Sequence, residues 1–140
     1  LSNEFKVYAE QVLNNAKKLS DTLIKEGFEL ITGGTENHLM VIDTIKSVNI
    51  DGKRSEELLD EVGITTNKQI IPDDPNPPLK PSGIRIGTPA ITSRGMKEDD
   101  MVNIGQWIAL ILKNSDNNSI KKRTAIEVRN FSEAFILPGI

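Results

Sequence analysis

Arg85 is the residue of this 140-residue chain whose surroundings best suit chemistry, because it stands between Ile84 and Ile86 in a short apolar pattern. Alternate side chains of a strand point to opposite faces, so the isoleucines would share one face and the guanidinium would occupy the other. Gly83 and Gly87 flank the trio. Since glycine has no Cβ, a neighbouring backbone or a ligand can come close there, which indicates a crowded site. An arginine in such a site could bind a carboxylate through two parallel hydrogen bonds.

A purely structural interpretation of Arg85 is also open. The residue could lie on an edge strand, facing water or paired with a nearby acid. Pro89 supports an edge, because proline lacks the N–H that a sheet ladder needs and should end the strand or place it at the margin of the sheet.

The rest of the chain predicts the elements that must position this strand. An amphipathic stripe formed by Phe5, Ala9, Val12, Ala16, Leu19 and Leu23 predicts a helix over 3–26, and Gly27 suits its left-handed stop. Branched residues predict strands over 28–31 and 39–43, paired antiparallel. Further on, we expect a short helix over 55–61 starting near Arg54 or Ser55, a strand over 64–69 and a proline-rich surface loop over 70–81. After the Arg85 strand we expect two more helices. The acids at 98–100 introduce the first, and the last carries Ile120, Thr124, Val128, Phe131 and Phe135.

This order of elements predicts an α+β fold of two layers, in which a small, mostly antiparallel sheet carries helices on one face. The length suits one domain with a moderate core. The apolar stripes of the helices need no cofactor to explain them, because core packing accounts for their spacing.

Composition excludes several classes of function. The formal net charge of −3 and a pI near 5.2 argue against a nucleic-acid or anionic-membrane partner. The absence of cysteine and the single histidine make a metal site improbable. No membrane-spanning apolar run and no signal peptide is evident, so a cytoplasmic location is expected. The chain opens on Leu1 and enters a helix almost at once, which suggests a piece of a longer protein.

Three other features carry weaker chemical signals. The turn at Gly33–Thr35 could bind a phosphate, but a strand pattern follows it instead of a helix, so a tight connection is favoured. His38 fits a hydrogen-bonded structural residue better than a catalyst. The acids of the short helix, Glu56, Glu57, Asp60 and Glu61, fit a solvated face, because neighbours on one exposed helix cannot act across a cleft.

Three motifs together resemble the C-terminal domain of serine hydroxymethyltransferase, the pyridoxal-phosphate enzyme that interconverts serine and glycine using tetrahydrofolate. They are SGIRIGTPAITSRG at 82–95, GGTENHL at 33–39 and GITTNKQIIP at 63–72. The last two are similar to the family's GGTDNHL and GITVNKNxIP. The motifs stand in the family's order and with its intervals, and the resemblance covers most of residues 1–113.

The resemblance implies roles for particular residues. Arg85 corresponds to the arginine that binds the α-carboxylate of serine or glycine. Gln69 stands where the family has the second asparagine of NKN, close to the pterin, and Lys68 lies beside it. Pro77, Pro78 and Leu79 replace a Ser-Pro-Phe segment of the folate loop. These departures affect the expected folate contacts and leave the amino-acid site intact.

The resemblance also implies what this chain does not contain. No lysine has the family's Schiff-base surroundings, so we expect no catalytic and no cofactor-binding residue in this chain and no metal. Residues 1–140 would form the C-terminal small domain of a longer fold-type I pyridoxal-phosphate transferase whose N-terminal, cofactor-binding domain is absent. The full-length enzyme would be a homodimer or homotetramer, whereas the chain alone would be inactive and mostly monomeric.

Two alternatives stay open at this point. One is the small domain of another pyridoxal-phosphate enzyme such as an aminotransferase, which the motifs at 33–39 and 63–72 oppose. The other is a stand-alone module that binds or senses an amino acid without catalysis.

Overall fold

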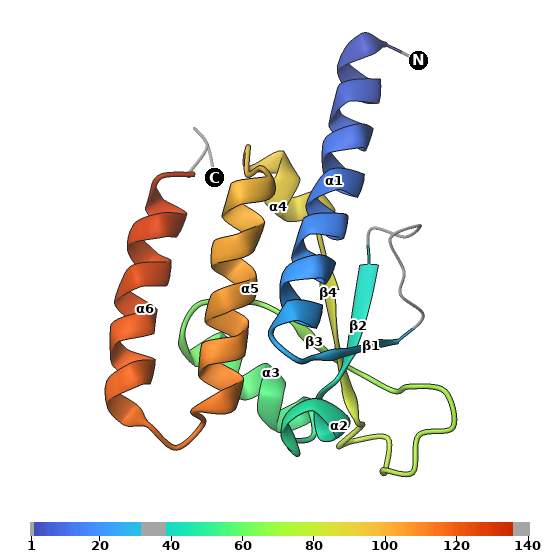
Figure 1. The fold of residues 1–140 in the computed structure, drawn as a ribbon, viewed down its shortest axis with the longest axis vertical. Helices are drawn as coiled ribbons and strands as arrows, with labels where there is room; N and C mark the ends of the chain where they lie inside the picture. Colours follow the sequence, from blue (N-terminus) through green and yellow to red (C-terminus); the bar gives the residue numbers. More distant parts are fainter. Residues whose placement is uncertain (1, 32–38, 136–140) are drawn as a thin grey trace.

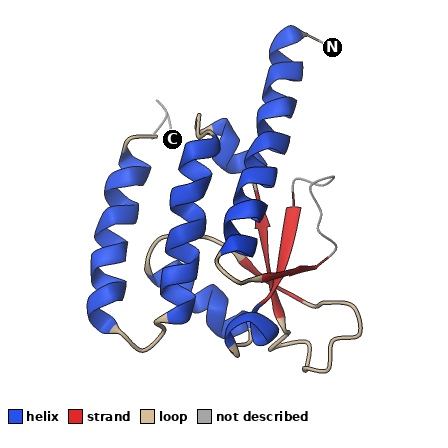
Figure 2. Ribbon diagram, in the orientation of Figure 1, coloured by secondary structure: helices blue, strands red, loops and turns tan. Residues whose placement is uncertain are grey.

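The computed structural model describes residues 2–31 and 39–135 of the chain, which form a layer of helices against a small sheet (Figures 1 and 2). The expected order of the larger elements is confirmed, and two short helices join them. The elements are α1 (Asn3–Lys25), β1 (Glu29–Ile31), β2 (Leu39–Asp43), α2 (Thr44–Val48), α3 (Gly52–Glu61), β3 (Asn67–Gln69), β4 (Gly83–Gly87), α4 (Pro89–Ser93), α5 (Glu98–Lys113) and α6 (Asn118–Glu133).

The sheet has the strand order β1-β2-β4-β3, and every neighbouring pair is antiparallel. The strand that carries Arg85, β4, therefore lies inside the sheet between β2 and β3. Of the two outcomes expected from Pro89, the end of the strand just before it is confirmed, and placement of the strand at an edge is wrong. Pro89 lies beyond the strand as the first residue of α4, where a missing N–H costs nothing.

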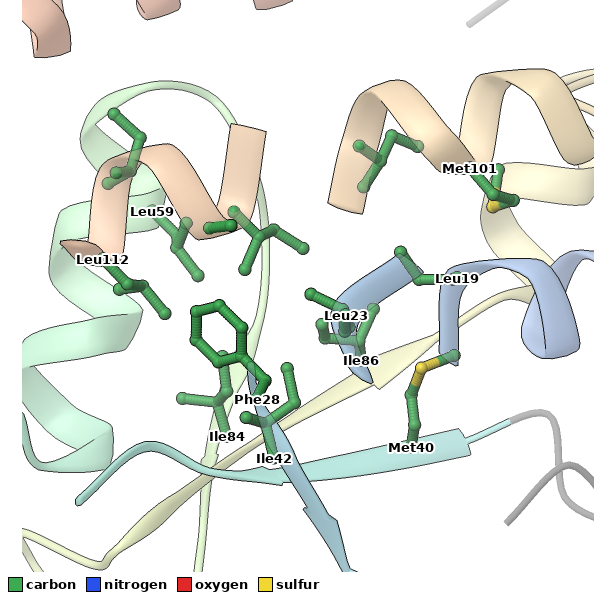
Figure 3. Packing of buried hydrophobic residues seen from close by; sticks show 14 of the residues in the cluster. Leu19, Leu23, Phe28, Met40, Ile42, Leu59, Ile84, Ile86, Met101 and Leu112 are labelled. Atoms are coloured by element: carbon green, nitrogen blue, oxygen red, sulfur yellow. The ribbon is translucent and has the colours of Figure 1, made fainter. Parts of the chain in front are cut away.

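The core lies between the sheet and the helices on one of its faces, which confirms the α+β prediction. Met40, Ile42, Ile84 and Ile86 point from β2 and β4 into a cluster that helices α1, α3 and α5 complete (Figure 3). Ile42 and Ile84 are completely buried. Burying a side chain of this size contributes about 1.5–3 kcal/mol, so this face of the sheet is strongly fixed.

Helix α1 buries its predicted stripe from Val12 onward. Leu19 and Leu23 are completely buried, whereas Phe5 is 52% exposed, because the first turns of α1 extend past the other elements (Figure 1). Gly27 follows the helix with a φ of 93°, the left-handed stop expected from its position.

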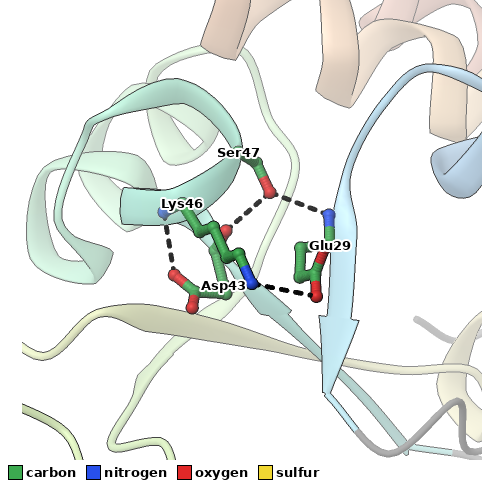
Figure 4. A network of polar contacts seen from close by, with 4 residues as sticks. All are labelled: Glu29, Asp43, Lys46 and Ser47. Atoms are coloured by element: carbon green, nitrogen blue, oxygen red, sulfur yellow. Dashed lines mark hydrogen bonds and ion pairs between the residues drawn. The ribbon is translucent and has the colours of Figure 1, made fainter.

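Helix α2 is an element that sequence patterns did not predict, since five residues are too few to show a period. Its start is fixed by Asp43, whose Oδ1 accepts the N–H of Lys46 at 2.9 Å. Ser47 donates its hydroxyl to the Asp43 carbonyl at 2.6 Å and accepts the N–H of Glu29 at 2.9 Å (Figure 4). The helix is thus tied to the ends of both β1 and β2.

Two predicted boundaries are wrong. Helix α3 begins at Gly52, not near Ser55, because the Asp51 side chain accepts the N–H of Arg54 at 2.8 Å and caps the helix earlier. Strand β3 is limited to Asn67–Gln69, so residues 64–66, which were predicted to belong to the strand, form a loop that leads into it.

Asn15 of α1 fixes the segment that follows β4. Its side chain is completely buried and donates to Thr92 Oγ1 and to the Met96 carbonyl, both at 2.9 Å. The carboxylate of Glu98 accepts from Gln11 at 2.6 Å, and this hydrogen bond is the main reason that the pKa of Glu98 is lowered. Helix α5 begins with the expected acids, and α6 buries Thr124 and Val128.

Candidate functional site

Arg85 is held at the middle of β4, with Val41 of β2 on one side and Asn67 of β3 on the other. Its neighbours Ile84 and Ile86 are buried against the helices, so Arg85 projects from the opposite, open face, as the alternation predicted. The side chain is exposed, and within residues 2–31 and 39–135 it makes no ion pair or side-chain hydrogen bond. A nearby acid of this described part therefore does not account for its presence.

The register determines which of the other candidate residues share the face of Arg85. Directly opposite residues of neighbouring strands point the same way, so Asn67 shares the row of Arg85. Gln69, opposite Gly83, belongs to the next row of the same face. Asn67 was not named from the sequence, although the period of two residues within Asn67–Gln69 would have placed it with Gln69.

Lys68 lies on the other face of the sheet. It pairs with Ile84, whose side chain points toward the helices, and it remains exposed because β3 is an edge strand. Its backbone N–H donates to Glu56 Oε2 at 2.7 Å, which fastens β3 to α3. The structure thus brings Gln69 to the side of Arg85 but does not bring Lys68 there.

Pro77, Pro78 and Leu79 form the exposed tip of the loop that joins β3 to β4, which projects away from α5 and α6 (Figure 1). The turn closes where Lys80 donates its N–H to the Pro77 carbonyl at 2.9 Å. Leu79 is 77% exposed. An apolar side chain displayed in this way on a stiff turn is suited to contact a flat apolar surface of a ligand or of another protein.

Asp74 organises this loop, although the sequence did not single it out. Its Oδ2 accepts the N–H groups of Ile71 at 3.2 Å and Ser82 at 2.9 Å, and its Oδ1 accepts the Asn76 N–H at 2.9 Å and the Ser82 hydroxyl at 2.7 Å. Partial burial would raise the pKa of Asp74, but these hydrogen bonds outweigh it and lower the pKa from 3.8 to about 2. The bond from Asn76, two residues on, is an Asx turn, a signal that could have identified the residue.

Gly83 confirms the crowding predicted beside Arg85, and its close neighbours are backbone carbonyls and one side-chain methyl group of the protein itself. A Cβ at Gly83 would lie 2.9 Å from the Ile42 carbonyl oxygen and 2.9 Å from Ile71 Cγ2. From the side of α3, a Cβ on Gly52 would overlap the Gly83 carbonyl oxygen. The buried N–H of Gly52 donates to the Pro81 carbonyl at 2.6 Å, which holds the two segments together.

Other predicted features lie elsewhere. Arg94 is an exposed turn residue at the end of α4, in the position expected for it. Gly33–Thr35 and His38 lie outside the described residues. Among residues 2–31 and 39–135, no three His, Cys, Asp or Glu side chains are grouped so as to hold a metal ion. No helix in the described ranges combines the length and apolar character needed to cross a membrane.

The lysines of the chain bear on whether it could hold pyridoxal phosphate. A lysine that forms a Schiff base is normally desolvated, which lowers its pKa and activates the amine. Every lysine of the chain falls within the described residues, and none is buried. Lys121, the least exposed, is engaged with Glu61 at 3.8 Å. The described residues therefore offer no desolvated lysine for a Schiff base.

The family model for serine hydroxymethyltransferase matches residues 1–108. Over 139 residues, the chain is 46% identical to a serine hydroxymethyltransferase of Rhodopirellula baltica, a match that covers 99% of this chain. The chain spans 33% of the length of that curated relative. On the strength of these matches, the chain belongs to the serine hydroxymethyltransferase family.

Proposed function

We propose that this chain is the part of a serine hydroxymethyltransferase that binds the substrate carboxylate through Arg85 and completes part of the folate site. The enzyme would interconvert serine and glycine and transfer the one-carbon unit to tetrahydrofolate. The observation that carries the proposal is the exposed guanidinium of Arg85 on the open face of the sheet, without a partner among the described residues. Family membership argues against the small domain of an aminotransferase.

The role of Arg85 would be to orient the amino acid. A planar guanidinium matches a carboxylate with two parallel charge-assisted hydrogen bonds, which fixes both the position and the rotation of the substrate. Because β4 is paired on both sides, the backbone that carries this group is rigid. Such positioning lowers the entropy cost of reaching the reacting geometry.

The folate contacts would come from Gln69 and from the loop tip at Pro77, Pro78 and Leu79. Gln69 lies one row from Arg85 on the same face, within reach of a ligand that extends along the sheet. Lys68 would contribute only from the edge of the sheet, because its side chain points to the other face.

The rest of the enzyme would hold pyridoxal phosphate, which supplies the electron sink for chemistry at the substrate α-carbon. Phe5, Val7 and Leu13 on the first half of α1 are 52%, 64% and 44% exposed, and they offer an apolar surface for that part of the protein. We expect a cytoplasmic homodimer or homotetramer. The chain alone should be mostly monomeric and should not cleave serine.

The test is a titration of serine and glycine into the full-length enzyme, followed by the visible absorbance of its bound cofactor. Arg85→Ala should lose most of the affinity, because a substrate carboxylate would be desolvated without its partner. Breaking such a pair costs roughly 3–5 kcal/mol, a factor of about 150 to several thousand in affinity. Arg85→Lys keeps the charge but loses the planar fork, so it should recover only part.

Arg94→Ala is the matched control, since it removes the same charge from an exposed turn beyond β4. It should change serine affinity much less, and all three variants should retain the cofactor. Equal losses in Arg85→Ala and Arg94→Ala would show that the carboxylate is bound elsewhere or by both arginines. Tight serine binding by the chain alone would instead favour a stand-alone amino-acid-binding module.

A further inference from the structure

Asp74 is the one carboxylate of the described loop between β3 and β4 that accepts four hydrogen bonds from protein donors. We infer that Asp74 is a positioning residue for tetrahydrofolate: it holds the loop over 70–82 in the shape that presents Pro77, Pro78 and Leu79 to the ligand. This inference rests on the proposed function, because it assumes that the loop tip belongs to the folate site.

The first step is closure of the loop at its base. Ile71 lies two residues after β3 and Ser82 directly precedes β4, and both donate their N–H groups to Asp74 Oδ2. One oxygen therefore bridges the two ends of the loop. This bridge continues beyond the last ladder pair, Gln69 with Gly83.

The second step transmits this order to the tip. Asp74 Oδ1 accepts the Asn76 N–H, and the Asn76 side chain donates to the Lys80 carbonyl at 3.1 Å. Lys80 in turn closes the turn on Pro77. The position of Leu79 thus depends on an unbroken series of hydrogen bonds that begins at Asp74.

The negative charge matters because three of the four partners are backbone N–H groups, which can only donate. An asparagine would accept through its oxygen, but its NH₂ group would face the remaining partners; the Ser82 hydroxyl could turn to accept from it, whereas at least one backbone N–H would be left unsatisfied. Asp73 provides a matched comparison. It has a φ of 54°, which asparagine tolerates well, and its carboxylate makes no hydrogen bond or ion pair with any described residue.

Arg85 should keep its position when Asp74 is changed. The Ser82 carbonyl accepts from the Thr44 N–H at 2.9 Å and from the Thr44 hydroxyl at 3.0 Å, independently of Asp74. Gly83 and Arg85 are then held by the ladders on both sides of β4. A change at Asp74 should therefore separate the folate response from the amino-acid response.

The experiment compares Asp74→Asn, Asp73→Asn and Leu79→Ala in the full-length enzyme. We expect Asp74→Asn to raise the KM for tetrahydrofolate about tenfold or more, as for the loss of one charge-assisted hydrogen bond. Its kcat at saturating tetrahydrofolate and its serine affinity should stay within about twofold of the parent. Hydrogen exchange measured by mass spectrometry should accelerate in peptides covering 70–82, and Asp73→Asn should match the parent in every measurement.

The outcomes distinguish the two levels of the proposal. If Leu79→Ala weakens tetrahydrofolate binding but Asp74→Asn does not, the inference about Asp74 is wrong and the folate role of the loop stands. If hydrogen exchange accelerates in Asp74→Asn while neither Asp74→Asn nor Leu79→Ala changes the KM for tetrahydrofolate, the loop lies outside the folate site. The folate part of the proposed function would then be wrong. An equal fall in serine affinity and folate affinity would mean that Asp74 merely supports the fold.

Discussion

Replacing Gly52 by alanine tests whether the backbone contact behind β4 holds the Arg85 strand in place. Gly52 is the first residue of α3, where helix propensity alone favours alanine over glycine by up to about 1 kcal/mol. The structure predicts the opposite sign, because the new Cβ would overlap the Gly83 carbonyl oxygen. Since this neighbour is backbone within a paired strand, no side chain can move aside to relieve the overlap.

The size of the effect follows from what must separate. Overpacking costs about 1–3 kcal/mol. Stretching the hydrogen bond from Gly52 to the Pro81 carbonyl, now 2.6 Å long, leaves buried polar groups poorly satisfied at about 1–3 kcal/mol. After subtracting the propensity gain, we expect a net loss of about 1–5 kcal/mol in the free energy of unfolding.

The assay is urea unfolding of the 140-residue chain, with Lys53→Ala as control. Lys53 is the next residue of the same helix turn and is exposed, so its replacement should change stability by less than about 0.5 kcal/mol. In the full-length enzyme, Gly52→Ala should also weaken serine binding, because Gly83 precedes Arg85 by two residues. An unfolding free energy equal to or above that of the parent would refute the reasoning, since α3 would then move away from β4 without cost.

Two further predictions concern stability. The pKa of Asp74 is about 2, against 3.8 in the unfolded chain, so its carboxylate stabilises the fold above pH 4. This contribution is at most about 2 kcal/mol before discounting for exposure to water, and it disappears as the pH falls toward 2. The free energy of unfolding should therefore fall less steeply with acid in Asp74→Asn than in the parent, and parallel curves would contradict the prediction. At Gly105 of α5, an added Cβ would lie 2.6 Å from Thr22 Cγ2, so Gly105→Ala should destabilise by about 1 kcal/mol despite its better helix propensity. Thr22→Ser removes that methyl group and keeps the hydroxyl that donates to the Lys18 carbonyl, so the double variant should recover part of the loss, and strict additivity would exclude a direct contact.

Much of the fold could be predicted because its long elements carry a clear period. The stripe through Leu19 and Leu23 and the alternation around Arg85 each follow from local geometry, and both agree with the structure. Helix α2 could not be predicted, since its start depends on a hydrogen bond that Asp43 accepts from the Lys46 N–H, and its position depends on contacts with β1. The exposure of Phe5 was missed because a stripe shows which face is apolar but not what covers it.

The candidate site, too, could be predicted from the sequence only in part. The face of Arg85 could be predicted from alternation, whereas its inner position depends on how β3 returns to pair with β4, a contact between segments joined by a long loop. The role of Asp74 was missed because four donors converge on it only when both ends of that loop meet. Lys68 and Gln69 were grouped by adjacency, and the register separates them.

The antiparallel register around β4 limits how the length of this chain can change. Deleting or inserting one residue within β2 or β4 would turn every later side chain of that strand to the opposite face. In β4, such a change ahead of Arg85 would bury the guanidinium and expose Ile86. Length changes can be accommodated without such an inversion in the connection over 75–80, where no ladder pair is formed. Variation in the reach of the loop is therefore accessible to evolution and to engineering while the orientation of Arg85 is retained.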